Sequence, residues 1–247
     1  MSEAIHYERV KEHLESLKLL AALNELDSLL EAGSREERSV SWFLDELLTR
    51  EVTHRFERRV AANLRLSGIP IRKTLDTFDY EAQPGVPKRT VEELSTLRFV
   101  HHGENVLILG PTGVGKTHLA IGLALKAIEH GHKVYFLTLH DLINKFRISR
   151  ERNKLPYLHS SILRAEVFVL DEVGFQALER DDAAFLFEVI NKRYVASKST
   201  ILTSNKSYGQ WHEIFPDSIL AVALLDRLLH RATTMNIQGD SYRLRHR

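Results

Sequence analysis

A glycine-rich stretch in the middle of the chain has the residue types of a phosphate-binding loop. It consists of Gly110, Pro111, Thr112, Gly113, Val114, Gly115, Lys116 and Thr117 and fits G-x-x-x-x-G-K-S/T. Consecutive backbone N–H groups surround a triphosphate only where no Cβ intrudes, which explains the glycines. The Lys116 ammonium would contact the β- and γ-phosphates, and the Thr117 hydroxyl would be a ligand for Mg²⁺. We therefore expect a nucleoside triphosphate with Mg²⁺ here.

Two carboxylates, Asp171 and Glu172, directly follow the apolar residues 167–170. At the carboxyl end of a strand, a first carboxylate can hold Mg²⁺ through water, and the next can take a proton from an attacking water. Any strand that ends in solvent can show the same pattern. Because the pair lies behind a phosphate-binding loop and one intervening strand, we expect Asp171 to bind the metal and Glu172 to act as the base.

Asn205 follows a further apolar segment, 200–203. By itself an asparagine after a strand is a common turn former. In combination with the two preceding motifs, its amide is expected to orient the hydrolytic water beside the γ-phosphate.

The elements that must position these residues alternate between strand and helix from residue 105 onward. Apolar runs predict strands at 105–109, 134–138, 167–170, 200–203 and 234–237. Helices are expected at 116–130, 139–149, 157–165, 182–196 and 218–231, with Asp181 as the cap of the fourth. This order predicts an α/β fold with a parallel sheet that helices cover on both faces.

The N-terminal region has a different pattern, with two expected helices. One covers 7–31, and the other begins between residues 39 and 41 and runs to about residue 66. Residues 74–88, with two prolines and a glycine, read as an irregular connector. We therefore expect a small all-α domain at 1–73 and the strand–helix domain at 74–247.

Composition excludes several classes of protein for this chain of 247 residues. With 43% hydrophobic and 27% charged residues it is neither a disordered polar chain nor a membrane protein. The longest apolar run, 219–225, is far shorter than the roughly 18 residues that span a bilayer. The absence of cysteine excludes disulfides and thiol catalysis and suits a reducing cytoplasm, the predicted location.

Positive charge is concentrated in three segments, although the formal net charge is only +1. Residues 50–73 hold seven bases and two acids, 141–154 hold five bases and two acids, and the last 21 residues hold five arginines and one acid. Each segment alone could be an ordinary solvated face. Together they favour one surface that contacts an anionic polymer.

At this point the sequence resembles the IstB-like AAA+ ATPases, the ATP-binding helpers of insertion-sequence transposition. These proteins are related to the helicase loader DnaC and the initiator DnaA. The resemblance rests on GPTGVGKTHLA, VLDEVG, ILTSN, LLDRLLHR and IQGDSYRLR, in this order. It implies a P-loop core with five parallel strands and a helical N-terminal domain for DNA binding or oligomerisation. It also implies ATP and Mg²⁺ as cofactors, multimers on duplex DNA, and recruitment of a transposase.

The resemblance implies that Arg227 completes the nucleotide site of a neighbouring subunit. There it would neutralise charge on the γ-phosphate. A helix arginine that pairs with Asp226 or solvent is the structural alternative, and Arg231 and Arg193 are alternative candidates for the same role.

The segment before the core and the end of the chain carry further implications. Thr77 and Phe78 fall where related ATPases contact adenine, although a core role for Phe78 fits equally well. Only 20 residues follow Arg227, too few for a helical lid. Arg243 or Arg245 could supply the lid arginine, but a frayed basic tail is the simpler interpretation. Hydrolysis should therefore depend strongly on the neighbouring subunit.

The resemblance also implies that residues 140–164 face DNA. Together with the basic N-terminal segment they would contact phosphates with little sequence specificity. The predicted DNA contacts are Arg55, Arg58, Arg59, Lys145, Arg147, Arg150, Arg152 and Lys154. Two other functions use the same loop: a helicase loader with ATP as its switch, and a small-molecule kinase. A helicase loader would differ from a transposition helper in its partner protein, and a kinase would differ from both in having a monomeric active site.

Overall fold

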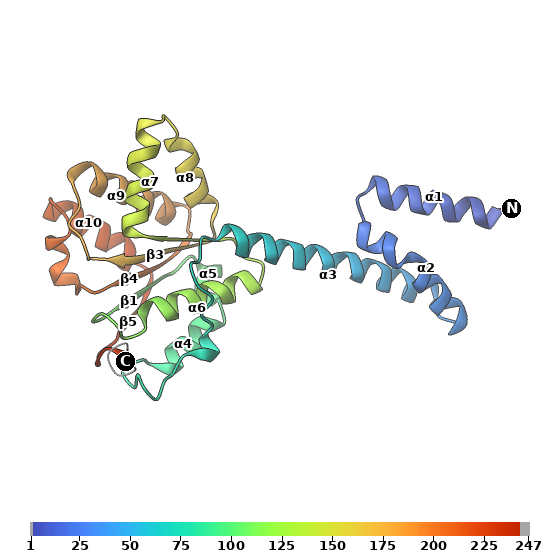
Figure 1. Cartoon of the computed structure of the whole chain (residues 1–247), viewed down its shortest axis with the longest axis horizontal. Helices are drawn as coiled ribbons and strands as arrows, with labels where there is room; N and C mark the ends of the chain where they lie inside the picture. The colour runs from blue at the N-terminus through green and yellow to red at the C-terminus, as the bar shows by residue number, and fades with distance from the viewer. Residues whose placement is uncertain (1, 243–247) are drawn as a thin grey trace. The chain divides into compact units, whose positions relative to one another are not determined.

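Five apolar segments form a parallel sheet in the computed structural model, which describes residues 2–242 (Figure 1). The strands are β1 (Asn105–Leu109), β2 (Val134–Thr138), β3 (Val167–Val173), β4 (Ser199–Ser204) and β5 (Ala232–Asn236). Their order is β2-β3-β4-β1-β5, and all neighbours are parallel. The predicted α/β fold is therefore confirmed, although β3 continues beyond its predicted end at Leu170.

Helices cover both faces of this sheet (Figure 1). One layer contains α6 (Lys116–Glu129) with the short helices α4 (Lys88–Ser95) and α5 (Arg98–His102). The opposite layer contains α7 (Leu139–Glu151), α8 (Leu155–Arg164), α9 (Arg180–Val195) and α10 (Ser218–Leu229). The 3₁₀ helices η1 (Leu75–Thr77) and η2 (Tyr208–Glu213) lie in connections. Sequence patterns missed α4 and α5 because both are short.

Strand alternation decides which side chains reach the site. Phe168 and Leu170 of β3 pack into the core with α7 to α10. Successive side chains on a strand point to opposite faces, so Val169 and Asp171 face the α6 layer. The same alternation places Thr203 of β4 on the α6 side, opposite Leu202. The α6 face of the sheet therefore carries polar groups where β3 and β4 end.

The start of α9 differs from its prediction. The expected cap, Asp181, lies inside the helix, and the N-cap residue is Glu179, which makes no side-chain cap hydrogen bond. The Asp181 carboxylate instead accepts from Arg150 of α7 at 2.6 Å. An ion pair with another helix has thus replaced the local cap.

The chain divides into two units, residues 1–62 and 63–247, with the division inside α3 (Val40–Leu66). In the first unit the predicted single helix over 7–31 is wrong. The structure has α1 (Ser2–Ser16) and α2 (Leu20–Arg35), separated where Lys18 takes a positive φ of 56°. These two helices and the first part of α3 share one apolar core, formed by Leu14, Ala22, Leu26, Leu29 and Leu47. Among the described residues, no helix combines the length and apolar character needed to cross a bilayer.

Candidate nucleotide-binding site

The phosphate-binding loop joins β1 to α6, with three glycines at positive φ. Gly115 has a φ of 94°, and a Cβ there would lie 2.6 Å from Cε2 of Phe78. Gly113 has a φ of 91°, and a Cβ there would lie 2.1 Å from Oγ of Ser241. These conformations and close approaches explain why glycine is required at both positions.

The Lys116 side chain lies inside this loop. It is only 8% exposed, and its Nζ donates to the carbonyl oxygen of Pro111 at 2.6 Å. When a nucleotide binds, this ammonium can exchange its hydrogen bond to the carbonyl for hydrogen bonds to phosphate oxygens, which is the role predicted for it.

Thr117 and Asp171 meet at the boundary between α6 and β3. The Thr117 hydroxyl is 3.0 Å from each carboxylate oxygen of Asp171, which is 2% exposed. A hydroxyl and a carboxylate in contact are hard oxygen donors of the kind that Mg²⁺ prefers. The donor set therefore fits Mg²⁺.

Glu172 lies next to this pair with its side chain exposed. Its φ of 62° is unusual for a residue other than glycine. Its backbone N–H donates to Oγ1 of Thr203 at 3.0 Å. The carboxylate lines the same cavity as the phosphate-binding loop, so the structure brings the predicted base to the predicted phosphate site.

A cavity of about 570 Å³ opens beside the loop and Glu172. Its wall includes residues that sequence reasoning did not single out, namely Ile71, Gln83, Thr203, Phe175 and Tyr242. His118 also lines it and bonds through Nε2 to the backbone oxygen of Thr74 at 2.8 Å. Burial lowers the pKa of His118 below its usual range, so the imidazole is neutral at pH 7. Apolar side chains of the wall, among them Ile71, Phe78 and Ile121, could contact a nucleotide base.

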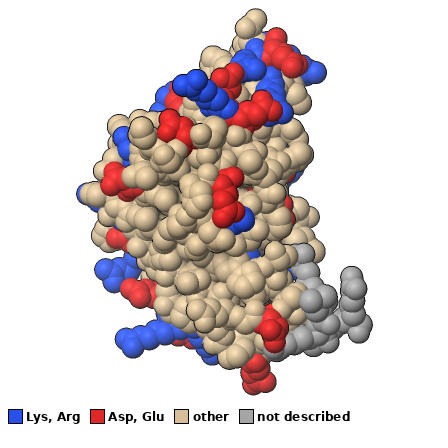
Figure 2. Space-filling view, turned by 90° about the vertical axis from the view of Figure 1, so that its left-hand side faces the viewer, with Lys and Arg blue, Asp and Glu red and all other residues tan. Residues whose placement is uncertain are grey.

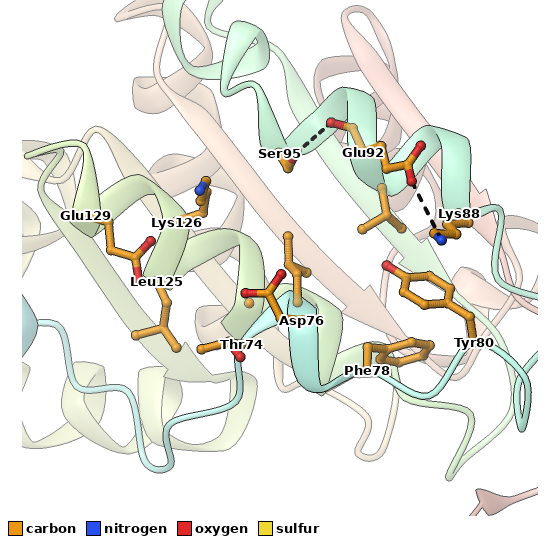
Figure 3. A pocket seen from close by; sticks show the side chains of 13 residues that line it. Thr74, Asp76, Phe78, Tyr80, Lys88, Glu92, Ser95, Leu125, Lys126 and Glu129 are labelled. Atoms are coloured by element: carbon orange, nitrogen blue, oxygen red, sulfur yellow. Dashed lines mark hydrogen bonds and ion pairs between the residues drawn. The ribbon is translucent and has the colours of Figure 1, made fainter.

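Phe78 separates this cavity from a second one. The second cavity, of about 370 Å³, lies between η1, α4 and α6 (Figure 3). Phe78 is 8% exposed and contacts Tyr80 and His118 edge-on, with ring centroids 4.9 and 5.1 Å away. Thr77 lines the first cavity, the one beside the phosphate-binding loop, which we call the nucleotide cavity. The Thr77 Oγ1 lies 3.3 Å from His118 Nε2. Phe78 thus belongs both to the core and to the cavity wall, and both expectations for it stay open.

Asn205 lies beside the turn that follows Glu172. A Cβ on Gly174 would lie 2.6 Å from Asn205 Oδ1. This oxygen is buried and has no hydrogen-bond partner. The structure therefore brings Asn205 close to the end of β3, although it is not part of the cavity wall. An unsatisfied buried acceptor at this place is compatible with a water-binding role.

These features have counterparts in known proteins. A family model described as IstB-like ATP binding protein matches residues 12–247. The chain belongs to this family. This IstB-like protein is 44% identical over 238 residues to the ATP-binding protein of insertion sequence IS5376 from Geobacillus stearothermophilus, which covers 96% of this chain and 94% of the relative. It is 42% identical over 232 residues to the IS21 ATP-binding protein from Pseudomonas aeruginosa, with 94% and 87% covered.

Solved structures agree with the fold of the IstB-like protein. The DnaC helicase loader superimposes with a TM-score of 0.54 and 24% identity, covering 61% of this chain and 89% of that chain. AMPPCP-bound DnaA from Aquifex aeolicus gives a TM-score of 0.59 and 20% identity, covering 71% and 53%. These likenesses show that the chain shares the fold of DnaC and DnaA. The family adds that the chain is an ATP-binding protein.

Arg227 of the IstB-like protein does not line the cavity of its own chain. It extends from α10 to α9, where Nε donates to Asn191 Oδ1 at 2.7 Å and the guanidinium lies 4.8 Å from the Phe187 ring centroid. Its Nη1 donates to the backbone oxygen of Ala223 at 2.8 Å. The alternative interpretation of Arg227 named Asp226 or solvent as its partner, and these hydrogen bonds go instead to Asn191 and to the Ala223 carbonyl.

Arg193 cannot act in a neighbouring site, so this alternative is wrong. The side chain is 1% exposed, and burial lowers its pKa to about 9. Its guanidinium donates to Thr200 Oγ1 and to the backbone oxygens of Ile162, Ala165, Glu166 and Ser199. Arg193 is therefore a buried link between α8, α9 and β4. Arg231, the other alternative, is exposed.

The predicted DNA contacts are all exposed but are not all free of acidic partners. Arg55 pairs with Glu51 at 2.6 Å in the first unit. In the second unit Arg147 pairs with Asp182 at 2.6 Å, and Arg150 pairs with Asp181. Arg58, Arg59, Lys145, Arg152 and Lys154 lie on the same two basic segments. The eight residues belong to two units, three on α3 and five in the segment from α7 to the start of α8.

The C-terminal segment passes along the phosphate-binding loop. The Tyr242 N–H donates to the Gly113 carbonyl oxygen at 3.0 Å, and Gln83 Nε2 donates to the backbone oxygen of Asp240 at 2.7 Å. Arg243 and Arg245, which were considered for the lid role, lie outside the described residues. As far as Tyr242, the segment is therefore part of the site wall in its own chain.

Proposed function

We propose that this IstB-like protein is an Mg²⁺-dependent ATPase that multimerises on duplex DNA and recruits or stimulates the transposase of its insertion sequence. The observation that carries the ATPase proposal is the arrangement around Asp171. This carboxylate contacts Thr117, and Glu172 lines the same cavity as the phosphate-binding loop. The family supplies ATP as the nucleotide.

The proposed hydrolysis gives each of these side chains a role. Bound Mg²⁺, held by Thr117 and by Asp171, would screen the charge of the phosphates. Glu172 takes a proton from a water whose oxygen bonds to the γ-phosphorus, while the bond from that phosphorus to the β–γ bridging oxygen breaks. Lys116 stabilises the charge that develops, and Asn205 orients the water. The products are ADP and phosphate.

The neighbouring copy would contribute Arg227. Two observations on α10 support this proposal. The first is that the Arg227 guanidinium has no contact with its own cavity. The second is an exposed apolar stripe on the same helix, formed by Ile219, Val222 and Leu229. Figure 2 looks onto the end of the second unit with α9 and α10 and shows a broad, mostly uncharged area, with charges gathered at the top and along the left and lower edges. Burial of such a stripe between copies would place α10, the helix that carries Arg227, at the interface.

The DNA proposal rests on the basic segments and on the relatives, which are named as proteins of insertion sequences. The helical region predicted as 1–73 would contribute Arg55, Arg58 and Arg59, and the region from α7 to α8 the other basic residues. Contacts with phosphates alone imply binding with little sequence preference.

A helicase loader that uses ATP as a switch is the second candidate, because the fold superimposes on most of the DnaC chain. The two functions differ in their partner. Affinity purification with an insertion-sequence transposase and with a replicative helicase distinguishes them, since only one should be retained.

The test of the ATPase proposal compares the wild type with Glu172→Gln. Both proteins are mixed with duplex DNA and either ATP or ADP, imaged by electron microscopy and assayed for phosphate release. We expect assembly with ATP, turnover only by the wild type, and persistent assemblies with Glu172→Gln. Equal turnover by both proteins would contradict the proposal.

A further inference from the structure

The Thr203 hydroxyl of β4 bridges the two carboxylate residues of the site. Its Oγ1 donates to Asp171 Oδ1 at 2.5 Å and accepts the backbone N–H of Glu172 at 3.0 Å. Thr203 is 1% exposed and lines the nucleotide cavity. One buried side chain is thus bonded both to the predicted metal ligand and to the backbone of the predicted base.

The bridge lies where the β3–β4 ladder is irregular. Regular pairing runs to Leu170 opposite Leu202, and the next pair is Val173 with Ser204, so the register shifts between them. Glu172 lies inside this bulge with its φ of 62°, and its N–H reaches a side-chain hydroxyl. A bulge of this kind turns a side chain out of the regular alternation. Here that side chain is the carboxylate of Glu172.

We infer that Thr203 is a positioning residue for ATP hydrolysis, which fixes Asp171 and the backbone of Glu172 together. This inference rests on the proposed ATPase function. A left-handed backbone at a glutamate is strained and persists only where neighbouring groups hold it. The Thr203 hydroxyl is such a group, because it satisfies the N–H that the bulge removes from the ladder.

Only a small side chain that both donates and accepts can make this bridge. Serine retains the hydroxyl, whereas valine keeps the shape and loses both hydrogen bonds. In Thr203→Val, Asp171 keeps its contact with Thr117, so nucleotide binding should persist. The Glu172 carboxylate would lose its fixed position, and turnover would fall.

Thr200 offers a matched control on the same strand. It is also 1% exposed, and its hydroxyl accepts from Arg193 Nε at 3.2 Å, at the opposite end of β4. Thr200→Val removes a buried hydroxyl from the same sheet without touching the site. It should lower stability while leaving turnover per folded protein unchanged.

The experiment measures ATP affinity by titration with a fluorescent ATP analogue, and kcat and KM for ATP with Mg²⁺ and duplex DNA. For Thr203→Val we expect kcat to fall about 10- to 100-fold with little change in affinity. Thr203→Ser should restore most of kcat. If Thr203→Val fails to fold, Thr203→Ala is measured with the same expectation.

The outcomes separate this inference from the proposed function. If the wild type and Thr200→Val hydrolyse ATP and Thr203→Val matches them, the positioning role of Thr203 is wrong and the ATPase function stands. If Thr203→Ser is as impaired as Thr203→Val, the hydroxyl bridge is not the cause and the inference also fails. If the wild type itself hydrolyses no ATP under these conditions, the proposed function fails and this inference fails with it.

Discussion

The Thr117 hydroxyl lies 3.0 Å from both carboxylate oxygens of Asp171, although the two residues are 54 positions apart in the chain. The contact joins the first turn of α6 to the end of β3. It places the two predicted Mg²⁺ ligands beside each other and next to the loop that would hold the phosphates.

Replacing Thr117 should remove the effect of Mg²⁺ on ATP binding while leaving Mg²⁺-independent ATP binding in place. Thr117→Val keeps the size of the side chain but removes the oxygen ligand, so ATP affinity should no longer rise when Mg²⁺ is added, and turnover should fall at least about tenfold. Titrations with and without EDTA measure this. Thr117→Ser is the control and should behave like the wild type. A full Mg²⁺ response in Thr117→Val would rule out Thr117 as a ligand.

Arg193 should prove important for stability. Replacing it with methionine leaves the carbonyl oxygens of Ile162, Ala165 and Ser199 without their buried donor. We expect the free energy of unfolding to fall by about 3 kcal/mol or more. Urea unfolding measures the change, with the exposed Arg231→Ala as the control. A stable Arg193→Met that loses only its assembly-dependent turnover would restore Arg193 as the trans arginine.

The folded first unit should be sensitive to acid through Glu51. Burial alone would raise the pKa of this carboxyl, but bonds from the Arg55 guanidinium and from the N–H groups of Ala22 and Ala21 outweigh it and lower the pKa from the usual 4.5. The stabilisation is therefore complete above pH 4.5 and is lost as the pH falls through the lower folded-state pKa.

Thermal unfolding of Glu51→Gln should reveal this dependence. The variant should be less stable than the wild type near pH 7, and the difference should shrink as the pH falls below 4.5. Glu57→Gln, on the exposed surface of the same helix, is the control. A difference that stays constant at every pH would show that charge on Glu51 is not the cause.

DNA binding should depend steeply on salt. If about five phosphate contacts form, affinity for duplex DNA should fall about 10²- to 10³-fold between 50 and 200 mM salt, because each contact releases counterions. Fluorescence anisotropy with random and insertion-sequence duplexes measures this. Arg58→Ala with Arg59→Ala should reduce the slope. Affinity that is insensitive to salt, or strong preference for one duplex, would oppose the phosphate-contact model.

The sheet and its strand ends could be predicted from sequence because their signals are local. Each strand is a short apolar run, and the phosphate-binding loop is a contiguous motif. Parallel strands bring their carboxyl ends to one edge, so Thr117 and Asp171 could be expected at the same edge of the sheet. The bridge made by Thr203 could not be predicted, because it depends on a register shift that leaves no pattern in the sequence.

Tertiary contacts explain where sequence reasoning was wrong. The leucines at 14, 17, 20 and 26 keep helical spacing across the break at Lys18, so periodicity predicted one helix where there are two. Asp181 has the residue type of a cap, but an arginine on another helix takes its carboxylate. Arginine is usually a surface residue, so nothing in the sequence indicated that Arg193 would be buried. Only the folded structure reveals the backbone carbonyl oxygens that accept its hydrogen bonds.

The central claim is that a site on one copy is completed by Arg227 of another. Mixing two inactive variants tests it most directly. Glu172→Gln lacks the base but retains Arg227, and Arg227→Ala retains the base but lacks the arginine. Each alone should bind ATP and release almost no phosphate. An equimolar mixture on duplex DNA should regain part of the wild-type turnover, because some interfaces then pair an intact base with an intact arginine. A mixture as inactive as its components, or full turnover by Arg227→Ala alone, would contradict the claim.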